Sequence, residues 1–135
     1  MMGNALLIAS ARESALLHVR EFEALRPLTP ADRTDVADIY YRTYLGSPHE
    51  MTAEEAREEI ARTWSGEYGD LMPEACLGAT IDNSFVGAIL TVQDPPWDDV
   101  PAGPFILDLF VLREHRGIGL GRSLVRAVQT LIIAG

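Results

Sequence analysis

A basic, glycine-rich turn lies between an apolar run and an amphipathic stretch near the end of the chain. It reads RGIGLGR and covers residues 116–122. Its glycines would let backbone N–H groups approach a ligand with no Cβ in the way. If a helix follows, its first N–H groups add unpaired donors and partial positive charge. This combination is typical of an anion site, and a phosphate or pyrophosphate is the ligand we expect.

A single carboxylate lies just before this turn. Asp108 is the only ionisable residue in the apolar run Phe105–Leu112. Burying a carboxylate is costly unless it has a partner or a chemical use. Two interpretations stay open, a base or amine anchor in a reaction, and a hydrogen-bonded structural group at the edge of a cleft.

The segments on either side of the turn predict a strand and a helix. Residues 105–112 (FILDLFVL) are almost wholly apolar, which favours an interior strand. After the turn, apolar residues recur at three- and four-residue spacing, as on one face of a helix. They are Leu120, Leu124, Val125, Val128, Leu131 and Ile132.

Two known phosphate-binding motifs do not fit the turn. The P-loop requires Gly-Lys-Ser/Thr, and neither the lysine nor the magnesium-binding hydroxyl is in place. The dinucleotide fingerprint G-x-G-x-x-G also fails, because Gly117, Gly119 and Gly121 give G-x-G-x-G.

The segment LDLFVLREHRGIGLGRSLVRAV, residues 107–128, resembles the signature motif of the GNAT superfamily of acyl-CoA-dependent N-acyltransferases. That motif, R/Q-x-x-G-x-G/A, follows a strand and opens a helix. Arg116, Gly119 and Gly121 stand at its fixed positions. The upstream order of elements is similar too, so that the resemblance covers about residues 20–133.

The resemblance implies acetyl-CoA as acyl donor and direct transfer to a primary amine of a small molecule or protein. Backbone groups at the end of the motif strand are expected to pair with the pantetheine arm, here those of Leu109, Phe110 and Val111. The pyrophosphate is expected on the backbone amides of Arg116, Gly117, Ile118, Gly119, Leu120, Gly121 and Arg122, and the two arginines can add charge.

Direct transfer needs a neutral amine, and therefore a base, as well as an N–H donor for the thioester oxyanion. Asp108 is the candidate base, and by resemblance the backbone amide near Val111 is the donor. Tyr40, Tyr41 and Tyr44 are expected to line the acceptor site, with at least one of them in the core. The open alternatives are a non-catalytic GNAT-like module for CoA binding or oligomerisation, and a general binder of phosphate ligands.

Composition excludes several other classes. The 135 residues suggest a single domain, and the formal net charge of −9 argues against nucleic acid as partner. Cys76 is the single cysteine and is expected to be a small buried hydrophobe, and a cytoplasmic location fits. No apolar run is long enough to span a membrane. The histidines lack metal-ligand spacing, so no metal site is expected.

Upstream, the pattern predicts an α+β fold, a mixed α/β sheet with flanking helices. Residues 4–19 favour a helix, although Ala5–Ser10 could instead form a strand followed by a helix over Ala11–Phe22. The remaining expected elements are a strand over Glu21–Leu28, a helix from Thr29 to Gly46, a helix from Thr52 with a capping box, a loop over Ser65–Pro73, and strands over Ala75–Ile81 and Phe85–Gln93.

Three further features leave alternatives open. The buried stripe of the second helix is predicted as Ala53, Ala56, Ile60 and Trp64, and its crowded glutamates form either a solvated face or a guide for a cationic substrate. Gly87 marks a bulge or a close backbone approach. The loop Asp94–Pro104, with four prolines, is either functional or a surface excursion with Trp97 pinned to the core.

The resemblance ends early, because the family continues with a further strand and helix after the motif helix. We expect residues 1–19 to be an N-terminal extension and 20–135 an incomplete GNAT-like domain. Truncation, exchange of elements in a dimer, and filling of the gap by the N-terminal segment are all consistent with this. An unfinished sheet edge invites association, so a homo-oligomer is expected.

Overall fold

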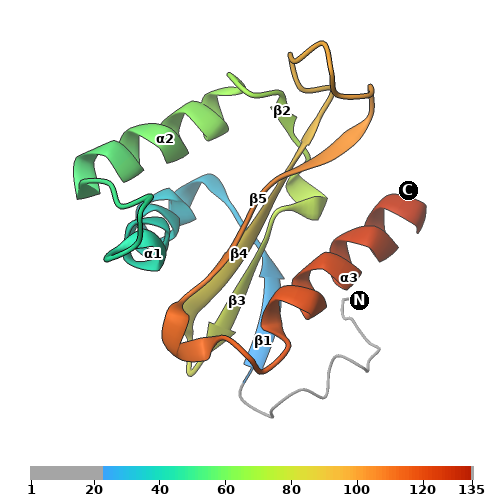
Figure 1. The fold of residues 1–135 in the computed structure, drawn as a ribbon. Coiled ribbons are helices and arrows are strands. Elements are labelled where there is room, and N and C mark those ends of the chain that lie inside the picture. Colours follow the sequence, from blue (N-terminus) through green and yellow to red (C-terminus); the bar gives the residue numbers. More distant parts are fainter. Residues whose placement is uncertain (1–22, 135) are drawn as a thin grey trace.

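The computed structural model describes residues 23–134. An antiparallel sheet forms the middle layer, with helices α1 and α2 on one face and α3 on the other (Figure 1). The predicted α+β class is therefore confirmed. The two alternatives for residues 4–19 lie outside the described residues.

Strand β4 (Ser84–Gln93) is the centre of the sheet. Strand β3 (Leu77–Ile81) pairs with one edge of β4, and strand β5 (Pro104–Val111) pairs with the other. Strand β1 (Glu23–Pro27) extends the sheet beyond β3, and the short β2 (Asp70–Leu71) pairs with the end of β4. The prediction that Ser65–Pro73 is only a loop was wrong, because this segment contains β2.

The two predicted strands form a hairpin, β3 and β4, with a two-residue loop. Asp82 and Asn83 have φ angles of 53° and 67°, as a type I′ turn requires. Strand β4 begins one residue earlier than predicted, because Ser84 already pairs with Ile81. At Gly87 the close backbone approach is confirmed, because a Cβ there would lie 3.0 Å from the Phe110 carbonyl oxygen.

Strand β5 is an edge strand among the described residues, so the prediction of an interior strand was wrong. Its side chains from Phe105 to Leu109 are partly exposed, and Leu109 is 39% exposed. Its pairing with β4 shifts between Asp108, opposite Leu90, and Ile106, opposite Thr91. Leu107 is therefore the extra residue of a β-bulge.

Helix α1 (Arg33–Tyr44) follows a single 3₁₀ turn (Pro30–Asp32), where the sequence predicted one helix from Thr29. Its inner face is buried at Val36, Ile39 and Thr43. Helix α2 (Ala53–Ser65) has the predicted capping box between Thr52 and Glu55. In its predicted stripe, Ala53 is exposed instead, and Thr63 is buried.

Helix α3 (Leu120–Ala134) covers the other face of the sheet. Leu120, Leu124 and Val128 are buried as predicted, whereas Leu131 is 36% exposed. Cys76, directly before β3, is buried in the core, as the sequence suggested.

The entry to α1 is fixed by a buried carboxylate. Asp32 accepts hydrogen bonds from both guanidinium nitrogens of Arg26, at 3.0 and 3.1 Å, and from the Thr29 backbone at 2.8 Å. The hydrogen bond from Arg26 is the main reason that the pKa of Asp32 falls from 3.8 to about 2. The ionised carboxylate therefore stabilises the folded state.

Replacing Asp32 by asparagine should lower the free energy of unfolding by about 1–2 kcal/mol at pH 7, since charge-assisted hydrogen bonds are lost. A lowered pKa in the folded state means that the wild-type advantage is present above pH 4 and disappears as the pH falls through about 2. Urea unfolding of both proteins over this range measures the difference. An equal deficit at pH 7 and pH 2 would contradict the charge explanation.

Candidate functional site

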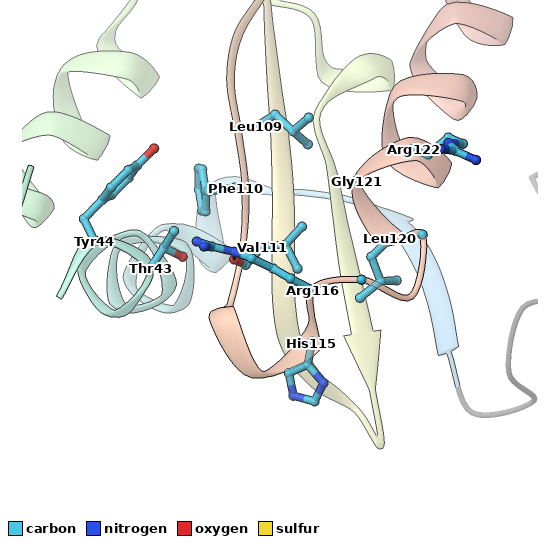
Figure 2. A pocket seen from close by; sticks show the side chains of 12 residues that line it. Thr43, Tyr44, Leu109, Phe110, Val111, His115, Arg116, Leu120, Gly121 and Arg122 are labelled. Carbon is cyan, nitrogen blue, oxygen red and sulfur yellow. Dashed lines mark hydrogen bonds between the residues drawn. The ribbon is translucent and has the colours of Figure 1, made fainter. Parts of the chain in front are cut away.

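An open hollow of about 420 Å³ lies where β5 ends and the glycine turn begins (Figure 2). Three elements surround it, the C-terminal part of α1, the last residues of β5, and the turn that leads into α3. The residues that line it are Thr43, Tyr44, Leu109, Phe110, Val111, His115, Arg116, Gly117, Gly119, Leu120, Gly121 and Arg122.

The turn has the backbone geometry that its glycines allow. Gly117 and Gly119 have φ angles of 83° and 88°, in the left-handed region that glycine adopts without strain. The first hydrogen bond of α3 runs from the Ser123 N–H to the Gly119 carbonyl, at 2.9 Å. The N–H groups that precede Ser123 therefore have no partner within the helix, and they lie at the hollow.

Gly121 leaves room for a ligand. A Cβ built at this position meets no atom within 4 Å, and its φ lies outside the strained region. A dianionic group placed against the start of α3 would meet both the free N–H groups and the positive end of the helix dipole. These residues fit the pyrophosphate that the sequence motif predicts.

The end of β5 offers backbone groups at its outer edge. The Leu112 N–H donates to the Val86 carbonyl at 2.8 Å, which fixes the alternation along the antiparallel pair. Backbone groups of Phe110 and Asp108 then point toward β4, and those of Leu109 and Val111 point away from it. Of the three residues expected to pair with a pantetheine arm, the geometry thus favours Leu109 and Val111.

Arg116 reaches from the turn back to this edge. Its Nε donates to the Val111 carbonyl oxygen at 2.9 Å. Figure 2 shows its side chain extending across Val111 toward Thr43. The positive charge therefore lies inside the hollow, whereas Arg122 lines the hollow from the first turn of α3.

The three tyrosines predicted to line an acceptor site separate in the structure. Tyr44 lines the hollow, but Tyr40 packs edge-on against both Tyr44 and Phe110, at 5.3 and 5.2 Å between ring centroids. Tyr41 lies beside a different surface depression, next to Glu50 and Met51. Burial and the nearby Asp108 raise the pKa of both Tyr40 and Tyr44, so both hydroxyls stay protonated.

Asp108 lies close to the hollow but does not line it. It shares a face of β5 with Phe110, the face covered by α1 and α2. Burial, and to a smaller extent the charge of Glu59, raise the pKa of its carboxyl from 3.8 to about 6. A carboxylate with this pKa takes up and releases protons near neutral pH.

Ile118 does not line the hollow either, because its side chain packs against the core. Two residues that line it were not predicted as site residues, Thr43 and His115. The position of His115 next to the glycine turn is a sequence signal that could have identified it as a site residue. For Thr43, no sequence signal marks its hydroxyl.

The Thr43 hydroxyl is buried without a hydrogen-bond partner among the described residues. Thr91 on β4 is the other residue in this situation. A buried hydroxyl without a partner costs free energy, so each is a departure from the usual rule. Thr43 lines the hollow, whereas Thr91 does not.

Two general findings complete the description of residues 23–134. In this range no group of three or more potential metal ligands comes together. No helix there has the length and apolar character needed to cross a membrane.

Comparison with known proteins agrees with the motif. The family model described as the acetyltransferase (GNAT) family matches residues 34–133. None of the curated proteins matches the chain significantly in sequence.

Solved structures show the same fold at low sequence identity. A protein from Pyrococcus horikoshii OT3 superposes with a TM-score of 0.66 at 18% identity, over 83% of this chain and 72% of its own. A GNAT family acetyltransferase from Brucella melitensis, solved with acetyl-CoA, gives 0.62 at 15% identity, over 85% and 71%. A Salmonella typhimurium protein, solved with its cofactor acetyl-CoA, gives 0.58 at 18% identity, over 84% and 64%.

Proposed function

Because the chain belongs to the GNAT family of acetyltransferases, we propose that it transfers an acetyl group from acetyl-CoA to a primary amine of a small molecule or protein. The observation that carries this proposal is one hollow that joins the glycine turn to the free edge of β5, with Asp108 beside it. Two structural neighbours that were solved with acetyl-CoA support the choice of acyl donor.

The proposed binding residues follow from the geometry. The N–H groups at the start of α3, together with Arg116 and Arg122, hold the pyrophosphate. The backbone groups of Leu109 and Val111 point to the outer edge of β5, where they can pair with the amides of the pantetheine arm. When bound, acetyl-CoA supplies the activated acyl group.

The chain's own residues then handle charge and protons. Asp108 takes a proton from the attacking amine, and an outward-pointing backbone N–H near Val111, that of Leu109 next to Asp108, stabilises the negative charge on the acyl oxygen. In the balance of the reaction, a bond forms between nitrogen and the acetyl carbon, the carbon–sulfur bond breaks, and the sulfur leaves as a thiol with one proton. The raised pKa of Asp108 makes it a stronger base than an ordinary carboxylate.

Thiol release from acetyl-CoA over a panel of amines tests this proposal. Release that depends on an amine supports transfer. Binding of CoA by calorimetry without any turnover would instead favour the non-catalytic CoA-binding module. All eleven basic residues of the chain are arginines, so acetylation of the protein's own lysine side chains cannot contribute to the signal.

The two buried hydroxyls offer a test of where the donor binds. Thr43→Val and Thr91→Val should each raise the free energy of unfolding by about 1 kcal/mol, because each removes an unpaired buried group. We expect only Thr43→Val to change the affinity for acetyl-CoA, since only Thr43 lines the hollow. Thermal unfolding and calorimetry on both variants measure this. An equal change in affinity for both would exclude a local effect.

We further propose that the protein forms a homo-oligomer and acts in a reducing cytoplasm. The outer edge of β5 has no strand partner among the described residues, and the part of such an edge that a bound donor leaves uncovered favours association. Light scattering measures the association. A monomer with full affinity for acetyl-CoA would exclude it.

A further inference from the structure

Three aromatic rings form a stack at the end of β5 that lies away from the glycine turn. Trp97, in the proline-rich loop before β5, stacks on Tyr68 with 6.0 Å between centroids and 24° between planes. It also meets Phe105 edge-on at 6.2 Å. Trp97 nevertheless remains 40% exposed. The expectation that it is pinned to the core was therefore wrong, and this end of the molecule presents a large aromatic surface.

The loop holds this surface in place. At its base, the Asp94 and Gly103 backbones pair at 2.9 Å, and the Asp94 carboxylate accepts a second bond from the Gly103 N–H. Prolines restrict the backbone between these two residues. The ring of Trp97 is thus positioned before any ligand arrives, which lowers the entropic cost of binding.

Tyr68 connects the aromatic stack to two carboxylates, those of Glu59 and Asp108. The Tyr68 hydroxyl donates to Glu59 Oε1 at 3.1 Å, and Glu59 also accepts from Arg62 at 3.3 Å. The charge of Glu59 acts on Asp108, where it raises the pKa. Glu59 therefore contacts the rings through Tyr68 and is near enough to Asp108 for its charge to act there.

The β-bulge brings the rings and the base to the same face of the sheet. Phe105 pairs with Val92, and Asp108 pairs with Leu90. Val92 and Leu90 are two residues apart on β4, so they share a face, and their partners share it with them. Phe105 and Asp108 consequently point toward the same layer although they are three residues apart.

Acidic residues predominate near the rings. Glu67 and Asp70 follow α2, and Asp94, Asp98 and Asp99 lie in the loop before β5, whereas Asp82 belongs to the hairpin at the opposite end of β4. Arg62 of α2 pairs with Glu59 at 3.3 Å and offsets part of this charge. A cationic ligand would be attracted here, and the exposed face of an indole is the best aromatic partner for a cation.

The direction of approach follows from the anchor of the donor. A ligand held at the turn after Val111 and running along the outer edge of β5 extends toward Phe105. The acceptor must then reach Asp108 from the other end, past Trp97 and Tyr68.

We propose that the acceptor is an aliphatic amine with a second, distal positive charge, held by the exposed part of the Trp97 ring and by Glu59 while its reacting nitrogen lies at Asp108. This proposal rests on the proposed function and adds the class of acceptor. Tyr68 is a positioning residue, because it orients Glu59 and supports the ring of Trp97.

A matched pair of amines tests the class. Pentylamine and 1,4-diaminobutane have the same number of heavy atoms and differ by one distal ammonium group. We expect kcat/KM to be about 10-fold higher for the diamine, the value of a partly exposed cation–π contact with a carboxylate nearby. The preference should shrink at high salt, because screening weakens attraction between exposed charges.

Variants show which residues cause the preference for the diamine. Trp97→Leu keeps an apolar side chain but removes the aromatic face, and it should reduce the ratio of kcat/KM between diaminobutane and pentylamine to about one. Tyr68→Phe should reduce it partly, since Glu59 loses one hydrogen bond. Trp64→Phe is the matched control, because Trp64 is the chain's other tryptophan and packs against the core on α2.

Binding gives a readout that does not need turnover. In the Trp64→Phe protein, Trp97 is the only tryptophan, and its fluorescence should change with diaminobutane but not with pentylamine. A change in Trp97 fluorescence with diaminobutane alone, without thiol release from acetyl-CoA, would support the cation site and contradict the proposed function. Turnover with equal kcat/KM for the two amines, and no selective change in fluorescence, would overturn the inference and leave the proposed function standing.

Discussion

Replacing Gly121 by valine should abolish the binding of acetyl-CoA while the protein stays folded. The new side chain would project into the space at the start of α3, where no protein atom lies within 4 Å of a Cβ. The phosphate groups would then be kept away from the free N–H groups of the helix. Loss of two charge-assisted hydrogen bonds corresponds to about 3–6 kcal/mol, or about 10²- to 10⁴-fold in affinity.

Calorimetry with acetyl-CoA measures this loss, and thermal unfolding checks the fold. Gln129→Val is the matched control, because it places the same side chain at an exposed position of the same helix. Gly119 is a poorer position for this experiment. Its φ of 88° strains any other residue, so a substitution there would confuse misfolding with lost binding. Unchanged affinity in a folded Gly121→Val protein would exclude the turn as the pyrophosphate site.

Asp108→Asn should give a protein that is more stable and much less active. If Asp108 is the base, its loss should lower kcat by about 10²- to 10⁴-fold. The raised pKa means that the ionised carboxylate destabilises the folded state at pH 7. Removing that charge should therefore raise the free energy of unfolding, by about 3 kcal/mol for a shift of this size.

The pH dependence gives an independent check. The folded protein holds the Asp108 proton more tightly than the unfolded chain, so stability from this group is present below pH 4 and is lost as the pH rises toward about 6. Activity should change in the opposite sense and rise through about pH 6, because the base works in its ionised form. In Asp108→Asn both dependences should vanish. An active variant, or a wild-type profile that is flat between pH 5 and 7, would assign Asp108 a structural role.

The glycine turn was predictable because its chemistry is local. Gly117, Gly119 and Gly121 stand within five residues, directly before a helix with a clear apolar period, and no distant contact is needed to bring them together. The same holds for the capping box at Thr52 and the hairpin at Asp82. Each of these depends on backbone preferences that a few neighbouring residues determine.

The second half of the site depends on pairings between distant segments. Periodicity suggested an interior β5, but position within a sheet is decided by which strands lie beside it, and apolar runs do not encode that. The placement of Glu59 near Asp108, and of Trp97 on Tyr68, joins residues that are 49 and 29 positions apart (108 minus 59 and 97 minus 68). The hydroxyl of Thr43 could not be recognised either, because a threonine on an apolar helix face gives no sign of its hydrogen-bond partners.

The bulge at Leu107 makes the pairing register of β5 part of the specificity. An insertion in the loop ahead of β5 would lengthen the approach and leave the faces of the strand unchanged. If residues 105–108 instead paired one for one with β4, Phe105 and Asp108 would face opposite layers, because they are three residues apart. Related chains can therefore change their acceptors by altering the length and sequence of the loop. Loss of the bulge without loss of a residue would separate acceptor recognition from the base.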